Sequence, residues 1–442
     1  MVPVSDQNLF RTVVLSRLPL GDSPIQYRDG YAIIASSPAV MASFNGGQKK
    51  PVTLVSEAQL SIYVDMALFK DEIQKAIQQY TRYAQGSDAR LMRSAMLFYA
   101  DWLKEMRGAS YSLSLNQKGI ELGYTMDLVP GGKMAAMLAA TPAGSPDLIG
   151  AMPADSYVAL GSRMNLKASL PYLEPVMGMF ETVQPELGTI LKEYLRDASL
   201  LYGDDYAMAL VPSKASGVTI LGAVRQGGGS TQALYRKLVD RLNGLRFVQR
   251  VRQEDARFGL VYEASAGTVS GVRYDTIRLD FTDPADSSEE TRRQVAFVRE
   301  VLTCHVAFKD GVEYWAMGTD AKNRLAGMLD GRAPAFRTSP AWRTMTASWG
   351  QYAKNGLMYF SLSGLLREVV AVIKRFDPDN AQTRVVEGML TRLPQDGGIY
   401  AMTRYAHNAV TVRGLVSESE IQAIAQFFLM AFGAAEKSAI GE

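Results

Sequence analysis

One order of elements recurs along this 442-residue chain, and it constrains the fold more than any single motif. The pattern of residues 152–242 predicts a short strand, a long helical segment, a hairpin and a further helix. Alternating apolar residues mark the strands, and apolar residues three and four positions apart mark the helices. The hairpin begins at Tyr206-Ala207-Met208, and Gly227-Gly228-Gly229 precedes the last helix.

The same order of elements is found once before this stretch and once after it. In each copy, one tyrosine lies in the opening strand and another near the start of the hairpin. Ser417 and Glu420 open the last helix of the third copy with the pattern of a capping box. Self-similarity of this kind usually marks duplication. We therefore predict two sets of equivalent positions: Tyr63, Tyr157 and Tyr359, and Tyr111, Tyr206 and Tyr400.

The fold class that this order predicts is α+β, in duplicated modules of antiparallel sheet with helices packed on one face. We predict a complete module at residues 146–442, with an internal repeat formed by residues 150–245 and 355–435. Residues 256–335, with four predicted strands, join the two halves of this repeat. Residues 1–145 resemble only the second half of such a module. The boundary is placed at the Pro- and Gly-rich segment 141–146.

The N-terminal part carries a predicted hairpin of Val13-Val14-Leu15 and Tyr31-Ala32-Ile33-Ile34-Ala35. A partial module would leave a sheet edge exposed near Val13 to Ala35, where another chain could pair. We therefore expect the chain to be the later part of a longer natural protein. Two alternatives stay open: the half-module is complete as it stands, or a second subunit supplies the strand.

Composition excludes few classes of protein. The formal net charge of +2 argues against a dedicated nucleic-acid surface, which needs a strong basic excess. Cys304 is the only cysteine, so no intramolecular disulfide can form. This fits a cytoplasmic protein, and equally an exported protein large enough to fold without disulfides. No targeting segment is visible, and no apolar run is long enough to span a membrane.

The glycine-rich turn at residues 227–229 is the most tempting candidate site, because a strand precedes it and a helix follows. Backbone N–H groups at a helix start attract anions. A phosphate-binding loop also needs a lysine before its Ser or Thr, however, and Gly229 precedes Ser230 here. We predict an ordinary connection between strand and helix, without nucleotide binding.

Cys304 and His305 are neighbours in a predicted strand, so their side chains should point to opposite faces. We interpret Cys304 as a buried structural thiol rather than a nucleophile. His407, the other histidine, is expected in the turn of the last hairpin. With two histidines and one cysteine, we expect no zinc site of the usual kind.

Asp280, Asp283 and Asp286, followed by two glutamates, form an oxygen-rich stretch of the kind that can bind calcium. Their spacing does not match an EF-hand loop. We predict instead a solvated loop in which Asp or Ser caps the next helix. Asp204-Asp205 is likewise interpreted as a turn rather than a catalytic pair. The sequence thus assigns no catalytic, cofactor-binding or metal-ligating residue.

Tyrosines and methionines alternate along several predicted strands, and most of them should lie in the core. A minority could line an apolar groove between sheet and helices, suited to a lipid or a peptide. The residues concerned are Tyr63, Tyr157, Tyr359, Met66, Met126, Met208, Met317 and Met402.

The segment Met152-Pro153-Ala154-Asp155-Ser156-Tyr157-Val158 resembles the Leu-Pro-Ala-Asp-Thr opening of an uncharacterised family of bacterial proteins, many of them exported. Met152 and Ser156 depart from the commoner residues. The resemblance implies a periplasmic or cell-surface location, and the family has no known activity to carry over to this chain.

Two functions from different classes therefore remain. The first is a non-enzymatic binding or structural protein of the bacterial cell envelope, with a protein or lipid partner and no nucleic acid. The second is a hydrolase or transferase whose site is assembled from residues far apart in the sequence. The shortage of histidine and cysteine favours the first, and a deep polar pocket with converging carboxylates would favour the second.

Overall fold

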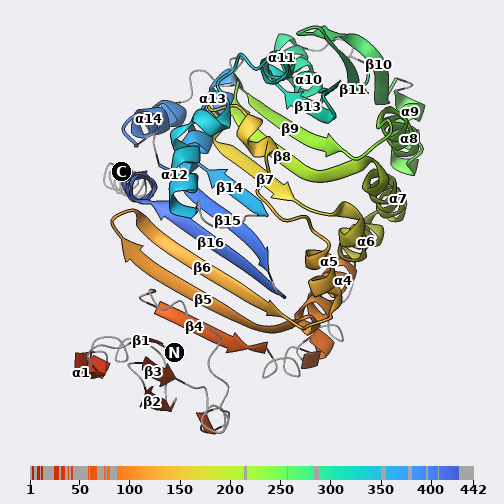
Figure 1. Cartoon of the computed structure of the whole chain (residues 1–442). Helices are drawn as coiled ribbons and strands as arrows, with labels where there is room; N and C mark the ends of the chain where they lie inside the picture. The colour runs from red at the N-terminus through yellow and green to blue at the C-terminus, as the bar shows by residue number, and fades with distance from the viewer. Residues whose placement is uncertain are drawn as a thin grey trace, which may run out of the picture.

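The computed structural model contains one 13-stranded antiparallel sheet with helices around it, which confirms the α+β class (Figure 1). The strands follow in the order β10 (Gly259–Val269), β11 (Val272–Asp280), β12 (Cys304–Lys309), β13 (Val312–Gly318), β9 (Val218–Gln226), β8 (Tyr202–Pro212), β7 (Val158–Arg163), β14 (Gly356–Phe360), β15 (Ile399–Ala406), β16 (Ala409–Ser417), β6 (Gly119–Leu128), β5 (Met106–Asn116) and β4 (Leu60–Asp65).

The structure describes most of the chain from residue 87 onward. The ranges are 87–213, 217–255, 257–282, 288–349, 355–376, 381–394, 397–406 and 408–427. Before residue 87 it describes residues 2–3, 7–9, 11–12, 24–28, 31–34, 38, 41–42, 58, 60–66, 74–75 and 77–79.

The predicted order of elements is present in the second and third copies. In the second, β7 is followed by α6 (Leu166–Val183), α7 (Pro185–Leu201), β8, β9 and α8 (Gln232–Asn243). In the third, β14 is followed by α13 (Leu362–Phe376), α14 (Ala381–Leu390), β15, β16 and a helix at 418–427. The opening strands of the two copies pair with each other, with Ala159 opposite Tyr359. The two copies therefore extend in opposite directions from a shared central pair of strands.

The N-terminal copy adds to the same sheet. Its strands β4, β5 and β6 continue beyond β16, and α4 (Ser87–Lys104) and α5 (Lys133–Ala139) accompany them. The four strands predicted between the second and third copies are β10 to β13, which extend the sheet at its other end. They are joined to α9 (Arg246–Glu254), α10 (Glu289–Val301) and α11 (Ala321–Asp330). Strands from both sides of the segment 141–146, at which the sequence predicts a domain boundary, thus belong to one sheet.

The residue-by-residue correspondence between copies is wrong. Tyr157 stands just before β7, eight positions ahead of Asn165, which caps α6 by accepting a bond from the Ala168 N–H. Tyr359 lies near the end of β14, two positions ahead of Ser361, which caps α13 in the same way. The two tyrosines therefore lie at different distances from the caps of the helices that follow them.

The tyrosines of the second set also lie on different faces of the sheet. The register places Tyr206 and Tyr111 in one row across the sheet, together with Thr403. Tyr400 lies three positions from Thr403, so it points to the other face, where it is buried. The order of elements recurs, but the side-chain directions differ because each strand takes its own register.

The predicted N-terminal hairpin also needs correction. Tyr31 to Ile34 do form a strand, β3 (Tyr31–Ile34), but its hairpin partner is β2 (Ile25–Arg28), which the sequence does not predict. β3 also pairs with β1 (Val2–Pro3), and α1 (Gln7–Leu9) follows that strand. Because β3 lies between two strands of a small sheet, it is not the exposed edge expected near Ala35. Residues 13–15 lie outside the described residues.

The capping box predicted at Ser417 is half right. The Ser417 hydroxyl accepts a bond from the Glu420 N–H at 3.3 Å, as an N-cap does. The Glu420 carboxylate does not return to its own helix; it accepts a bond from the Leu362 N–H at 2.8 Å. It therefore caps α13 and ties the C-terminal helix to α13 within the third copy.

One face of the sheet, here called the covered face, carries the main core. Ala207, Ala209 and Val211 alternate along β8 on this face and are buried. They pack with residues of α11, η4 (Leu148–Ala151), η5 (Phe336–Thr338) and α12 (Pro340–Trp349). In Figure 1, α12 lies across the sheet in front of β14 and β15. The opposite face, here called the open face, carries the residues between these positions.

We predict that Gly161→Ala lowers the free energy of unfolding by about 1–3 kcal/mol, the usual cost of overpacking a core. A Cβ at Gly161 would lie 2.6 Å from Cβ of Ile149, which is fully buried in η4. Urea denaturation followed by circular dichroism measures the change. The control is Gly388→Ala in α14. No neighbouring atom lies within 4 Å of the added Cβ there, and the loss of glycine should stabilise the helix. Equal stability of the Gly161→Ala variant and the native protein would contradict the packing described here.

Candidate functional site: an apolar trough across the open face

A continuous row of apolar residues crosses the open face from β4 to β12. Each residue of the row is the registered partner of the next on the neighbouring strand. Eleven strands contribute one residue each: Leu60, Leu113, Leu122, Gly414, Ala401, Met358, Leu160, Met208, Gly222, Trp315 and Val306. With ten steps of about 4.8 Å between strands, the row is roughly 48 Å long.

A second row runs beside it, two residues further along each strand. Ile62, Tyr111, Tyr124 and Val412 form its apolar part. At the far end, Val224 lies opposite Glu313, the one carboxylate of this row. The two rows together form the floor of a long depression, which we call the trough.

The floor is hollowed in two places that meet at Ala401 and Val412. The hollow over β4 to β16 has a volume of about 460 Å³, and the hollow over β14 to β12 has a volume of about 790 Å³. Tyr194 of α7 and Tyr235 of α8 line the second hollow. The trough therefore has one apolar end over β4 to β6 and one end with polar groups beneath α7 and α8.

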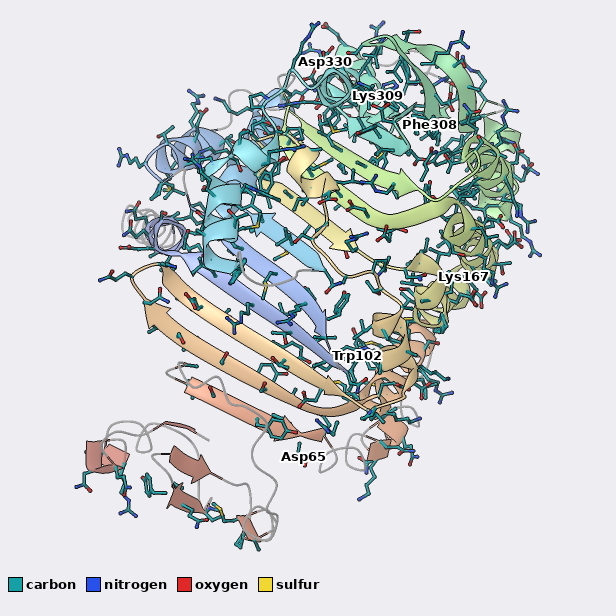
Figure 2. All side chains as sticks on the ribbon, viewed as in Figure 1. Asp65, Trp102, Lys167, Phe308, Lys309 and Asp330 are labelled. Carbon is teal, nitrogen blue, oxygen red and sulfur yellow. The ribbon has the colours of Figure 1, made fainter. Side chains whose placement is uncertain are left out.

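Helices border the trough along one edge of the sheet. Figure 1 shows α4 to α9 in a continuous arc along that edge. Trp102 of α4 and Met134 of α5 join a cluster with Met126 and Tyr405 from the open face. Figure 2 shows Trp102 near the strand ends, on the side where these helices lie.

Large apolar side chains on the trough floor are exposed to solvent. Tyr111 is 49% exposed, Leu122 47% and Ile62 44%. On β5, Ser110, Ser112 and Ser114 alternate with the apolar residues and face the other side of the sheet. An antiparallel sheet with one wet face normally turns its polar residues to the water and its apolar residues to the core. Here the core cluster with α4 and α5 covers only one end of the apolar side at β4 to β6, and Ile62, Tyr111 and Leu122 remain exposed.

The polar end of the trough is organised around Glu313, which is 1% exposed. Three hydroxyl groups, one from β8 and two from α8 and its N-cap, donate to its carboxylate. Thr231 at the start of α8 donates to Oε2 at 2.6 Å, and Tyr202 of β8 donates to Oε1 at 3.1 Å. Tyr235 of α8 also donates to Oε1. These bonds hold α8 and β8 to β13.

Burial raises the pKa of the Glu313 carboxyl above its usual range, and the hydrogen bonds from Thr231, Tyr235 and Tyr202 oppose that shift. Burial also raises the pKa values of Tyr202 and Tyr235, which therefore keep their protons and remain donors at neutral pH. The nearby charge that acts on Glu313 is Asp275, a second carboxylate, which raises its pKa further.

The glycine-rich turn connects β9 to α8, as predicted. Gly228 and Gly229 have φ values of +147° and +81°, a conformation that suits glycine. The helix that follows starts with Thr231, whose hydroxyl is bonded to Glu313. A buried carboxylate at this helix start disfavours a bound phosphate, so the prediction that no nucleotide binds here gains a physical reason.

Cys304 and His305 point to opposite faces, as predicted. Cys304 lines the trough, and burial raises the pKa of its thiol to about 12, so it is a poor nucleophile at neutral pH. His305 lies on the covered face, where its Nδ1 is 3.2 Å from the Thr276 hydroxyl and its ring packs edge-to-face on Tyr274. His407 lies outside the described residues.

The acidic stretch is divided between separate contacts. Asp280 ends β11 and pairs with Arg257 at 3.3 Å. Ser288 caps α10 by accepting a bond from the Thr291 N–H at 3.1 Å, which confirms the predicted cap. Asp283 and Asp286 lie outside the described residues. Within the described part of the chain, no group of three or more His, Cys, Asp or Glu side chains is arranged to hold a metal ion.

Asp204 and Asp205 lie within β8 rather than in a turn, so that interpretation was wrong. A bulge between Tyr202 and Tyr206 gives this part of the strand its irregular backbone. Asp204 forms an ion pair with Arg163. Asp205 is buried and accepts a bond from the Asp147 N–H at 3.0 Å. The two carboxylates have different partners and do not form a catalytic pair.

Most of the tyrosines and methionines singled out in the sequence are buried in the core, as expected. These are Tyr157, Tyr359, Met66, Met126 and Met402. Met208 instead lines the trough. Glu313, the centre of the polar end, was missed. Its signal in the sequence was a lone glutamate inside the otherwise apolar strand Val312–Gly318.

Comparison with known proteins adds little. No protein-family profile and no curated protein matches the chain. Among solved structures, crystal form I of TP0453 aligns with 64% of this chain and 99% of its own at 10% identity. The TM-score of 0.26 is too low for this likeness to support an argument. Among the helices within the described ranges, none is both long and apolar enough to cross a membrane.

We predict that Glu313 makes stability fall as the pH rises. Its pKa is higher in the folded state than in the unfolded chain, so the folded state binds more protons between these two values. The stabilising contribution is present below the usual glutamate pKa of about 4.3 and is lost as the pH passes the raised value.

The measurement is urea unfolding of the native protein and of Glu313→Gln over a series of pH values. The unfolding free energy of the native protein minus that of the variant should be largest at low pH and should decrease as the pH rises. A difference that stays constant, or that grows with pH, would show that the carboxyl is not destabilised by burial.

Proposed function

We propose that the trough binds the hydrocarbon chains of a lipid and that the protein is a non-enzymatic lipid-binding component of the bacterial cell envelope. The observation that carries the proposal is the solvent exposure of Ile62, Tyr111, Leu122 and Met358, which belong to the two rows of the trough floor. Contiguous apolar surface of this size on a folded protein usually marks a binding site. Burial of such a surface against a chain stabilises the complex in proportion to the apolar area removed from water.

A lipid chain suits the trough better than a peptide. A peptide brings one N–H and one C=O per residue, and each costs free energy when it is buried without a partner. The floor of the trough is a sheet face, on which the backbone groups already bond within the sheet, and its side chains are mostly aliphatic or aromatic. A hydrocarbon chain needs no hydrogen-bond partners.

The length of the trough supports the same choice. One leaflet of a bilayer has about 15 Å of hydrocarbon, half of a core about 30 Å thick. The apolar row is roughly three times as long, so it has room for more than one chain end to end. The envelope location rests on the resemblance of residues 152–158 to an exported bacterial family.

The alternative function, a hydrolase or transferase, has less support. The polar groups at the trough end are three hydroxyls that all donate to Glu313, and the pKa values of the Tyr202 and Tyr235 hydroxyls are raised by burial rather than lowered. An activated nucleophile needs a base that accepts its proton and a lowered pKa, and Cys304 has the opposite shift.

We predict that Leu122→Lys weakens the binding of an uncharged, environment-sensitive fluorescent acyl probe by about tenfold or more, because the ammonium group would be desolvated by the chain. Leu122 is half exposed, so the fold should tolerate the change. Fluorescence titration of the delipidated protein measures the affinity.

The matched control is Ser114→Lys, which adds the same charge on the neighbouring strand but on the other face of the sheet. Its affinity for the probe should equal that of the native protein. If the probe does not bind to the native protein, or if both variants bind it equally well, the lipid-binding proposal fails.

A further inference from the structure

The charge balance inside the trough restricts the head group of its ligand. Among the described residues that line the two hollows, Glu313 alone carries a formal charge when ionised. The partners of its carboxylate are the neutral hydroxyls of Thr231, Tyr202 and Tyr235. A carboxylate held only by neutral donors in an apolar site keeps its negative field uncompensated.

A second carboxylate strengthens this field. Asp275 is 2% exposed and lies opposite Val306 on the open face, next to the trough floor. Its bonds also come from neutral groups, namely the Tyr262 hydroxyl at 2.6 Å, the Gln232 amide at 3.0 Å and the Ser265 N–H at 2.8 Å. Arg236 lies over the ring of Tyr262, 5.6 Å from its centre, and acts on that tyrosine rather than on Glu313.

The phenol oxygens at this end are hydrogen-bond acceptors, so like the Glu313 carboxylate they favour a positively charged or donor group. Tyr202 and Tyr235 use their O–H groups to donate to Glu313, and the two phenol oxygens are 3.1 Å apart. A phenol that donates its proton still has lone pairs on its oxygen. The Tyr202 and Tyr194 hydroxyls are also hydrogen-bonded to each other, and the phenol lone pairs that remain are acceptors for a ligand, polarised by the carboxylate behind them.

From these observations we infer that the ligand is an amphiphile with a primary ammonium head group, which lies against Tyr202, Tyr235 and Glu313 while its chain extends along the apolar row. The ammonium provides the missing counter-charge and three donors for the phenol oxygens. A carboxylate or phosphate in the same place would meet two buried carboxylates and no cation from the lining. This inference rests on the proposed function and names the chemical class of the ligand.

The test compares a saturated long-chain amine, alcohol and carboxylic acid of equal chain length, each competing with the uncharged acyl probe for the delipidated protein at neutral pH. The amine should bind about tenfold or more tightly than the alcohol, because hydrogen bonds to charged groups are stronger than neutral ones. The acid should bind more weakly than the alcohol. A phospholipid with an ethanolamine head group distinguishes a zwitterionic source of the ammonium from a simple amine.

Glu313→Gln removes the charge and should abolish the preference for the amine, measured as the ratio of the amine and alcohol affinities of the same variant. Glu121→Gln, a matched change of an exposed glutamate on the other face, should leave the preference intact. If the Glu313→Gln variant does not fold, Tyr235→Phe provides the second readout, since loss of one phenol oxygen should lower the preference for the amine.

The outcomes separate this inference from the proposed function. Binding of all three chains with equal affinity, or a preference for the amine that survives Glu313→Gln, overturns the inference and leaves the lipid-binding function standing. Absence of binding of any chain overturns both.

Discussion

The pairing of β7 with β14 determines the rest of this structure. It joins residues about two hundred positions apart in the sequence, with Ala159 opposite Tyr359, and every other strand of the 13-stranded sheet is placed by its register outward from this pair. Because side chains alternate with a period of two, a slip of one residue here would exchange the covered and open faces over half of the molecule. The straight apolar row of the trough exists only because each pair of strands keeps its register.

The two faces of the sheet are stabilised in different ways. On the covered face, fully buried side chains such as Leu325, Phe336 and Met345 close the core over the central strands. On the open face, the helices lie mainly along one edge, and the floor over β4 to β6 remains exposed. Side-chain caps at helix starts, among them Asn165, Ser361 and Glu420, fix the helices at the two ends of the strands. The fold thus leaves part of an apolar face uncovered, next to a core cluster that α4 and α5 close at one end of the strands.

Glu313 shows how a polar group can be kept in such a surface. Burial of a carboxyl without partners would destabilise the fold, and three hydroxyls from β8 and α8 reduce that cost. The same contacts connect β8, β13 and α8 at one end of the trough. One group of side chains therefore holds elements together and gives the trough a distinct chemical polarity, apolar over β4 to β6 and negative beneath α7 and α8.

The sequence by itself determined the α+β class, the recurring order of elements and the apolar character of the alternating strand residues, because these patterns are local. It also indicated that an apolar groove was possible and that Cys304 and His305 would point apart. It could not give the pairing of β2 with β3, the strand conformation of Asp204 and Asp205, or the unequal positions of Tyr157 and Tyr359. Only the tertiary structure decided which apolar residues share a row, and only it brought Thr231, Tyr202 and Tyr235 to Glu313. Strand register and contacts between distant elements depend on pairings that no local pattern specifies.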